Sequence, residues 1–177
     1  MTHYDQELAR ELVAMAEADQ AMRNRALETG VWDAAMDARH TTRLKEIITC
    51  HGWPTVSLVG PEAASAAWLL AQHADHDPDF QGRCLALMQQ LPIGEVSPAH
   101  LAYLEDRVRV NTGRPQRYGT QFHGGGATFR PRPIEDLEQL DTRRHSVGLP
   151  PFAQYQEQLA RRDKQHQEAI QQPDGRQ

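Results

Sequence analysis

Apolar residues recur at helical spacing from the start of the chain. Between residues 5 and 28 they follow one another at steps of four, three and seven, so they fall on one side of a helix with 3.6 residues per turn. The positions that carry this period are Leu8, Leu12, Met15 and Met22. The pattern therefore predicts an amphipathic helix that ends near Gly30.

Later segments combine helical spacing with the residues that begin a helix. Residues 61–75 start with a proline and are almost wholly apolar, which predicts a helix buried on most of its faces. Asp77 and Ser97 each precede a proline, and this order is typical of a capping residue followed by the first helical turn. Further helices are expected over residues 33–50, 78–91, 98–110 and 134–148, and from residue 150 onward.

Strand-like alternation is almost absent, and the exception is a short extended segment over residues 115–122. It leads into "HGGG" at residues 123–126, which predicts a flexible tip. The sequence therefore predicts an all-α fold, a single-domain irregular helical bundle of about six or seven helices with a long Gly- and Pro-containing loop near residues 112–133. We expect the domain to cover residues 1–160, and residues 161–177 to form a polar, disordered tail.

Composition narrows the compartment and the partners. The net charge is −5 and the arginines are dispersed, so the chain has no basic patch for a phosphate backbone and nucleic acid is not an expected partner. The first residues do not have the pattern of a secretory leader, and the longest apolar stretch, residues 66–71, is far shorter than the roughly 20 residues of a membrane span. Two cysteines suit a reduced compartment. These features predict a cytoplasmic protein without a membrane partner.

The stretch "QHADHDPDF", residues 72–80, holds two histidines and three aspartates directly after the almost wholly apolar run of residues 63–71. His73 continues the apolar face of the helix predicted there, so its ring is expected to enter the interior, either as a structural histidine or as a site residue. Asp77 and Asp79 suit a helix cap and a first helical turn. His73 is therefore the strongest candidate for chemistry in this stretch.

A second candidate region covers residues 100–122. Tyr103, Asp106 and Arg107 share one side of the expected helix, opposite its apolar stripe. Alternate residues of the extended segment that follows point to one side, which groups Gln116, Tyr118 and Thr120. Neutral donors and acceptors beside Asp106 and Arg107 suit a small polar ligand, and a solvated surface loop is the alternative.

Three stretches carry a resemblance to an uncharacterised bacterial domain-of-unknown-function family. They contain "GWP" at 52–54, "AAWLLAQHADHD" at 66–77 and "YLEDRVRVNTGRPQRYGTQ" at 103–121, where the family tends to read GWP, AAWLLxQHADxD and YLxDRVxVxxGxPQxYGTQ. The resemblance implies no activity or cofactor. It implies that the family pattern includes Trp53, Gln72, His73, Asp75, Tyr103, Asp106, Arg107, Gln116, Tyr118, Thr120 and Gln121, together with Asp19, Gln20 and Arg23. The family pattern varies at His76.

We therefore expect a polar pocket around His73, in which His73 acts as general acid or base on a small polar or anionic substrate. Asp75 or Asp106 would orient its ring, and Arg107 would bind an anionic group. Residues 123–126 would serve as a mobile flap. The expected substrate-binding residues are Trp53, Gln72, Tyr103, Arg107, Gln116, Tyr118, Thr120 and Gln121.

Two other functions fit the same residues. In the first alternative His51, His76, Asp77 and Asp106 bind a divalent metal, in the order found in HD-type phosphohydrolases, which are also helical. In the second the chain is a non-catalytic binding or partner protein. The preferred hypothesis requires a small-molecule substrate and no cofactor, and the sequence leaves the oligomeric state open.

Overall fold

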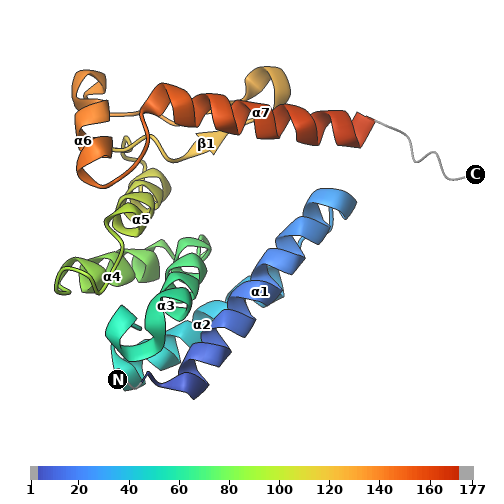
Figure 1. Ribbon diagram of the computed structural model, residues 1–177. Helices are drawn as coiled ribbons and strands as arrows, with labels where there is room; N and C mark the ends of the chain where they lie inside the picture. Colours follow the sequence, from blue (N-terminus) through green and yellow to red (C-terminus); the bar gives the residue numbers. More distant parts are fainter. Residues whose placement is uncertain (1–3, 172–177) are drawn as a thin grey trace, which may run out of the picture. The chain divides into compact units, whose positions relative to one another are not determined.

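The computed structural model describes residues 4–171 and is mostly helical, as the sequence predicts (Figure 1). This part of the chain contains seven α-helices, two short 3₁₀ helices and one two-stranded sheet. Its contacts divide the chain into two compact units, which meet in sequence between Leu104 and Glu105. The predicted single domain, residues 1–160, therefore contains residues of both compact units.

The first unit consists of four helices and the beginning of a fifth. They are α1 (Gln6–Thr29), α2 (Ala34–His51), α3 (Val56–Gln72), α4 (Pro78–Gln89) and the first half of α5 (Pro98–Asn111). Aspartates begin three of them, because the carboxylates of Asp5, Asp33 and Asp77 accept the backbone N–H three residues later. The predicted cap at Asp77 is confirmed.

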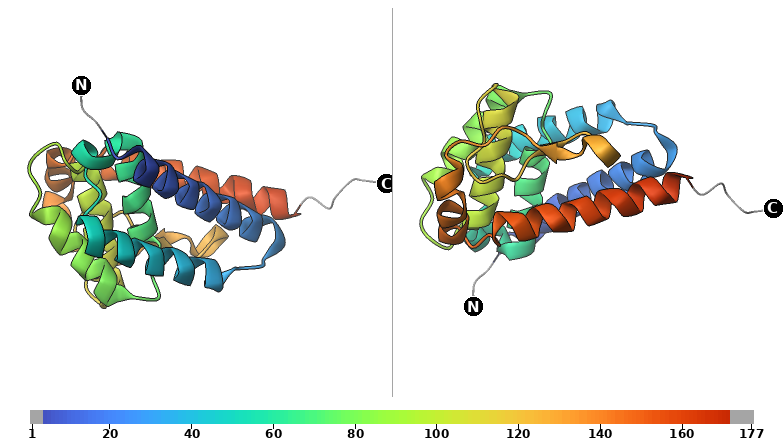
Figure 2. Two further views of the ribbon diagram at one scale, coloured as in Figure 1. Left: turned by 90° about the horizontal axis from the view of Figure 1, so that it is seen from below. Right: turned by 90° about the horizontal axis from the view of Figure 1, so that it is seen from above.

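The helix α1 packs along α3 (Figures 1 and 2). Small residues on α3 permit this close approach, and Ala63, Ala67 and Ala71 are all buried there. From α1, Leu8 and Leu12 fill the same core. The apolar stripe predicted from helical spacing therefore does face the interior at these two positions.

The helix α3 starts earlier than the sequence suggests. The hydroxyl of Thr55 accepts the N–H of Leu58 and begins a turn at Val56. Gly60 then interrupts the helix with a φ of 82°, a left-handed value that glycine adopts without strain. Pro61 follows in the first turn of the main segment, so the sequence signal at Gly60 and Pro61 marks a kink within α3.

The second unit contains the end of α5 and the elements that follow it. They are β1 (Phe122–His123), η1 (Gly126–Thr128), β2 (Arg130–Pro131), η2 (Leu137–Gln139), α6 (Leu140–Ser146) and α7 (Phe152–Gln171). The strands β1 and β2 are antiparallel, with Phe122 opposite Pro131. The ring of Phe122 lies 5.2 Å from that of Phe129 and 6.2 Å from that of Phe152, so three half-buried aromatic rings pack together at this hairpin.

The flexible tip predicted at "HGGG" lies in the turn of the hairpin, where the N–H of Gly126 donates to Asp163 on α7 over 2.7 Å. Its role as a mobile flap stays a prediction. One expectation for this region needs correction. The tail predicted to be disordered from residue 161 is helical as far as Gln171. Arginine, glutamine, lysine and alanine are good helix formers, and Arg161 pairs with Glu157 one turn earlier. Residues 172–177 of the predicted tail lie outside the described residues.

Within residues 4–171 no helix has both the length and the apolar character to cross a bilayer.

Candidate functional site

An aspartate and a histidine from distant parts of the sequence meet in the first unit. Asp19 lies in the middle of α1, and His73 is the residue directly after α3. Because α1 packs along α3, Nδ1 of His73 lies 2.7 Å from Oδ2 of Asp19. The carboxylate side chain is 1% exposed and the imidazole 16%, so the pair is buried on the aspartate side and reachable on the histidine side.

Asp19 is held in its ionised form. Burial raises the pKa of its carboxyl, but hydrogen bonds from His73 and Arg23 outweigh burial and bring the pKa down from 3.8 to about 2. Nε of Arg23 lies 3.1 and 3.0 Å from the two carboxylate oxygens, and Nε2 of Gln20 donates to Oδ2 over 2.9 Å. At neutral pH Asp19 is therefore a buried carboxylate with three donors.

The charge of Asp19 fixes the tautomer of His73. An ionised carboxylate accepts hydrogen bonds and donates none, so Nδ1 of His73 must carry the hydrogen in this contact. In the neutral ring the lone pair then lies on Nε2. This arrangement orients the imidazole and makes Nε2 the atom that takes up or releases a proton.

A small cavity of about 220 Å³ adjoins this ring. Arg23 spans one part of its wall, since NH2 donates to Asp37 over 2.9 Å and the guanidinium lies 4.7 Å from the ring of Trp32. The charge of Arg23 is thus shared between two aspartates. The lining residues are Arg23, Trp32, Ala34, Asp37, His73, Asp75 and His76.

A second histidine lies close to the same carboxylates. Burial lowers the pKa of His40, although the charges of Asp19 and Asp37 act in the opposite direction. Its Nδ1 is buried and has no hydrogen-bond partner among the described residues. His40 is therefore neutral at pH 7, and it adds no charge to the surroundings of His73.

The orienting carboxylate is Asp19, and the prediction of Asp75 or Asp106 for that role needs correction. Asp75 lines the cavity, and its Oδ1 accepts a hydrogen bond of 3.2 Å from Nε2 of Gln81. The same Gln81 nitrogen donates to the backbone oxygens of Ala71 and Gln72 at the end of α3. Gln81 thus fixes the turn that carries Asp75.

Asp106 has a structural function in the second unit. Its buried carboxylate accepts the backbone N–H groups of Arg117, Tyr118 and Thr120 at 2.6, 3.0 and 3.0 Å, and the hydroxyl of Thr120 at 3.0 Å. Four donors occupy its two oxygens, so the side chain holds the segment after α5 in place. This geometry disfavours the catalytic role that the sequence suggested.

The amides expected to bind substrate serve the same loop. Nε2 of Gln116 donates to the backbone oxygens of Gln121 and Arg132, and its Oε1 accepts the N–H of Gln121. The side chain of Gln121 donates to Thr120 and accepts from Arg107 over 2.8 Å. These groups are hydrogen-bonded within the unit, so a substrate would compete with the contacts that shape the loop.

The remaining predicted residues lie elsewhere. Trp53 is buried beside a second cavity, and the ring centroid of Tyr103 lies 6.0 Å from that of Trp68 in a T-shaped arrangement. Oε1 of Gln72 is buried and has no hydrogen-bond partner in the part that the structure describes. Burial raises the pKa of Tyr118, whose backbone N–H is one of the donors to Asp106. None of these four residues lines the cavity beside His73.

Two residues of the metal-binding alternative, Asp77 and Asp106, are engaged in other contacts. Oδ1 of Asp77 caps α4, and Oδ2 lies 2.6 Å from Nζ of Lys45, which holds the pKa of this carboxyl below its usual range. Across residues 4–171 no three His, Cys, Asp or Glu side chains form a group that could hold a metal ion. The geometry favours a capping role for Asp77.

The sequence analysis assigned no chemical role to Asp19, although its position in the sequence indicates that its side chain is buried. Asp19 continues the apolar stripe of α1 between Met15 and Met22, at steps of four and three. A carboxylate on the buried side of a helix needs a partner, and that is the reason to search the rest of the chain for a histidine or an arginine. Asp37 and Trp32 gave no comparable signal.

The chain matches the family of unknown function DUF6624 over residues 6–164. It belongs to this family. The match to DUF6624 includes Asp19, His73 and the loop around Asp106, and it confirms the expected likeness to a domain-of-unknown-function family. Neither curated proteins nor solved structures gave a significant match to the chain.

Proposed function

We propose that this DUF6624 chain is an enzyme in which His73 acts as general acid or base on a small polar substrate. The observation that carries the proposal is the contact of 2.7 Å between Nδ1 of His73 and the buried Asp19, beside a cavity. His73 lines this cavity, and a carboxylate that fixes one ring nitrogen of a histidine favours proton transfer at the other.

In the proposed step Nε2 of His73 removes a proton from a polar group of the substrate. The ring becomes an imidazolium, and the negative charge of Asp19 stabilises it. The proton then returns from Nε2 to the leaving atom or to the product. A positioned acid or base contributes a rate factor of about 10² to 10⁴.

The cavity limits the substrate. A volume of about 220 Å³ is below the 300–1,000 Å³ of ordinary ligand pockets, so the substrate has few heavy atoms. In its lining the guanidinium of Arg23 pairs with the carboxylate of Asp37 over 2.9 Å, so these two opposite charges offset each other. The proposed substrate is therefore a small polar molecule.

A metabolite extract offers a direct test. Wild-type protein and the His73→Asn variant are incubated with the extract, and mass spectrometry identifies compounds that the wild type consumes. We expect His73→Asn to lower the rate of consumption at least 100-fold, while its circular dichroism and melting temperature stay near those of the wild type. If the variant consumes the same compounds at the wild-type rate, or if no compound is consumed, the proposal is wrong.

His51→Asn is the matched control, because His51 is exposed and does not line the cavity. It should leave the rate unchanged. Loss of activity in His51→Asn together with metal in the purified protein would favour the HD-type alternative.

A second candidate function, binding of a protein partner, rests on one observation. Three apolar side chains at the connection from α1 to α2 are exposed, with Leu27 at 58%, Val31 at 70% and Trp32 at 50%. Exposed apolar groups that lie together mark many interaction sites. A protein that co-purifies with the wild type and is lost in Val31→Ser, without any consumption of metabolites, would support this function.

A further inference from the structure

A second cavity, of about 470 Å³, lies in the first unit among α3, the connection from α4 to α5, and the start of α5. Its volume falls within the range of ordinary small-molecule pockets. The residues that line it are Trp53, Val56, Pro61, Ala64, Ser65, Trp68, Met88, Ile93, Gly94, Glu95, Val96, Ser97, Pro98 and His100. None of them lines the cavity beside His73.

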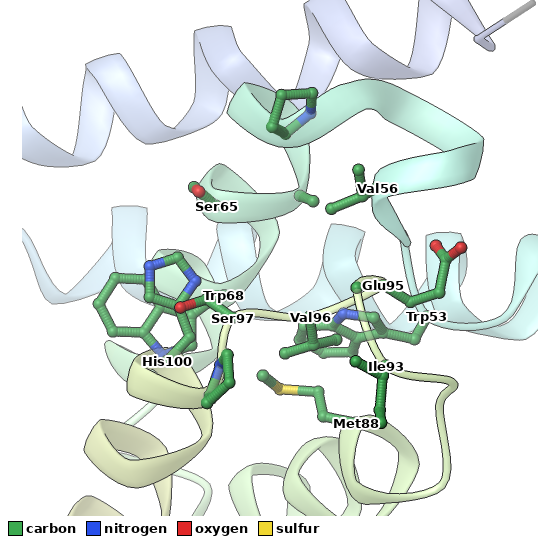
Figure 3. Close-up of a pocket in the computed structure, with 14 residues that line it drawn as sticks. Trp53, Val56, Ser65, Trp68, Met88, Ile93, Glu95, Val96, Ser97 and His100 are labelled. Carbon is green, nitrogen blue, oxygen red and sulfur yellow. The ribbon is translucent and has the colours of Figure 1, made fainter. Parts of the chain in front are cut away.

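Aromatic rings stand on two sides of this cavity. Trp68 stacks on His100 with ring centroids 3.9 Å apart and an angle of 3° between the planes. Figure 3 shows this stacked pair on one side, Trp53 on the other and Met88 below. Large flat apolar surfaces and a thioether give favourable contacts to an aromatic ring.

The lining offers no positive charge for a ligand. Glu95 is its one ionised side chain, and its carboxylate accepts hydrogen bonds from the backbone N–H and the hydroxyl of Ser57. Burial lowers the pKa of His100, so this ring is neutral at pH 7. The hydroxyls of Ser65 and Ser97 remain as polar groups among the lining residues.

We propose that this cavity binds a small, uncharged aromatic compound. The rings of Trp53 and Trp68 would contact its two sides, and a polar group on the compound would reach the side on which Ser65 and Ser97 lie. An anionic compound would lose its hydration in a mostly apolar cavity without an opposite charge, and the carboxylate of Glu95 already accepts hydrogen bonds from Ser57. Binding here is independent of the chemistry proposed for His73.

Indole is a suitable probe, and the three tryptophans of the chain report on its binding. Each indole N–H of the protein gives one signal in a ¹⁵N–¹H correlation spectrum, assigned with single Trp→Phe variants. Titration with unlabelled indole should shift the signals of Trp53 and Trp68 along one saturating curve. The signal of Trp32, which lines the other cavity, should stay in place.

Two comparisons test the location and the ligand class. Ser65 is exposed and lines the cavity, so Ser65→Leu places a larger side chain at this site and should weaken indole binding at least tenfold. Ala38→Leu adds the same side chain at an exposed position of α2 outside the cavity, and it should leave the affinity unchanged. Indole-3-carboxylate, which carries a charge, should bind at least tenfold more weakly than indole.

The proposal is overturned if no saturating shift of Trp53 occurs up to the solubility of indole. Equal shifts of all three tryptophans, or an unchanged affinity in Ser65→Leu, would also refute it. Equal affinity for the carboxylate would refute the uncharged class. Because Trp32 reports on the cavity beside His73, a failure here is distinguishable from a failure of the proposed enzyme function.

Discussion

The charge of Asp19 should stabilise the fold as well as orient His73, and Asp19→Asn tests this. Asparagine has nearly the same shape and retains one acceptor oxygen, but it lacks the negative charge that faces Arg23 and His73. The substitution therefore removes the electrostatic part of the interaction and keeps most of the packing.

The size of the effect follows from the pKa. The carboxyl of Asp19 has a pKa of about 2 in the folded protein against 3.8 as its ordinary value, which corresponds to about 2 kcal/mol of stability at neutral pH. A folded pKa below the unfolded one means that this stability is present above about pH 4. It is lost as the pH falls from about 4 to about 2.

Urea unfolding followed by circular dichroism gives the measurement. The free energy of unfolding of Asp19→Asn should lie about 2 kcal/mol below that of the wild type at pH 7, and the difference should shrink steadily below pH 4. A difference that is absent at pH 7, or that has the same size at pH 7 and pH 2.5, would refute the assignment of Asp19 as a buried ionised acceptor. Asp33→Asn is the control, since asparagine also caps helices and the difference should be small.

Three other substitutions address the second unit and the start of α4. Asp106→Ala leaves the N–H groups of the following loop without their acceptor. We expect the free energy of unfolding to fall by about 3 kcal/mol or more and hydrogen exchange at Thr120 to become faster. Unchanged exchange would contradict the structural role. Gly119→Ala should lower the stability measured by thermal unfolding by about 2 kcal/mol or more, because φ is 68° and the added Cβ would lie 2.7 Å from the ring of Phe152. An unchanged stability would mean that the loop adopts another conformation. Asp77→Ala should cost about 1 kcal/mol through loss of the cap of α4 and should leave the metal content of the purified protein unchanged, a result that elemental analysis checks.

Local interactions explain why the helices could be predicted. The caps at Asp33 and Asp77 involve a side chain and an N–H group three residues away, and the apolar stripe of α1 needs nothing beyond the helical period. These interactions involve only residues that are close together in the sequence, so the sequence shows both partners. They predicted the number of helices and most helix starts, and they located the long irregular segment before α6.

The same local signals misled where a residue has a partner far along the chain. Asp106 was predicted as a site residue because it is charged, yet it is buried because the segment of Arg117 to Thr120 turns back onto it. Gln116 was expected to meet a substrate, and its amide closes the same loop. Periodicity indicates which side of an element a residue occupies, but the identity of its neighbour depends on how the elements pack.

The sequence alone determined that this protein is helical, where most of its helices begin, and that His73 is a histidine on an otherwise apolar face. The tertiary structure decided which carboxylate that histidine meets. Asp19 and His73 are 54 residues apart and come together because α1 lies along α3. The helical period is set by hydrogen bonds between near neighbours, whereas this contact depends on the packing of two whole helix faces.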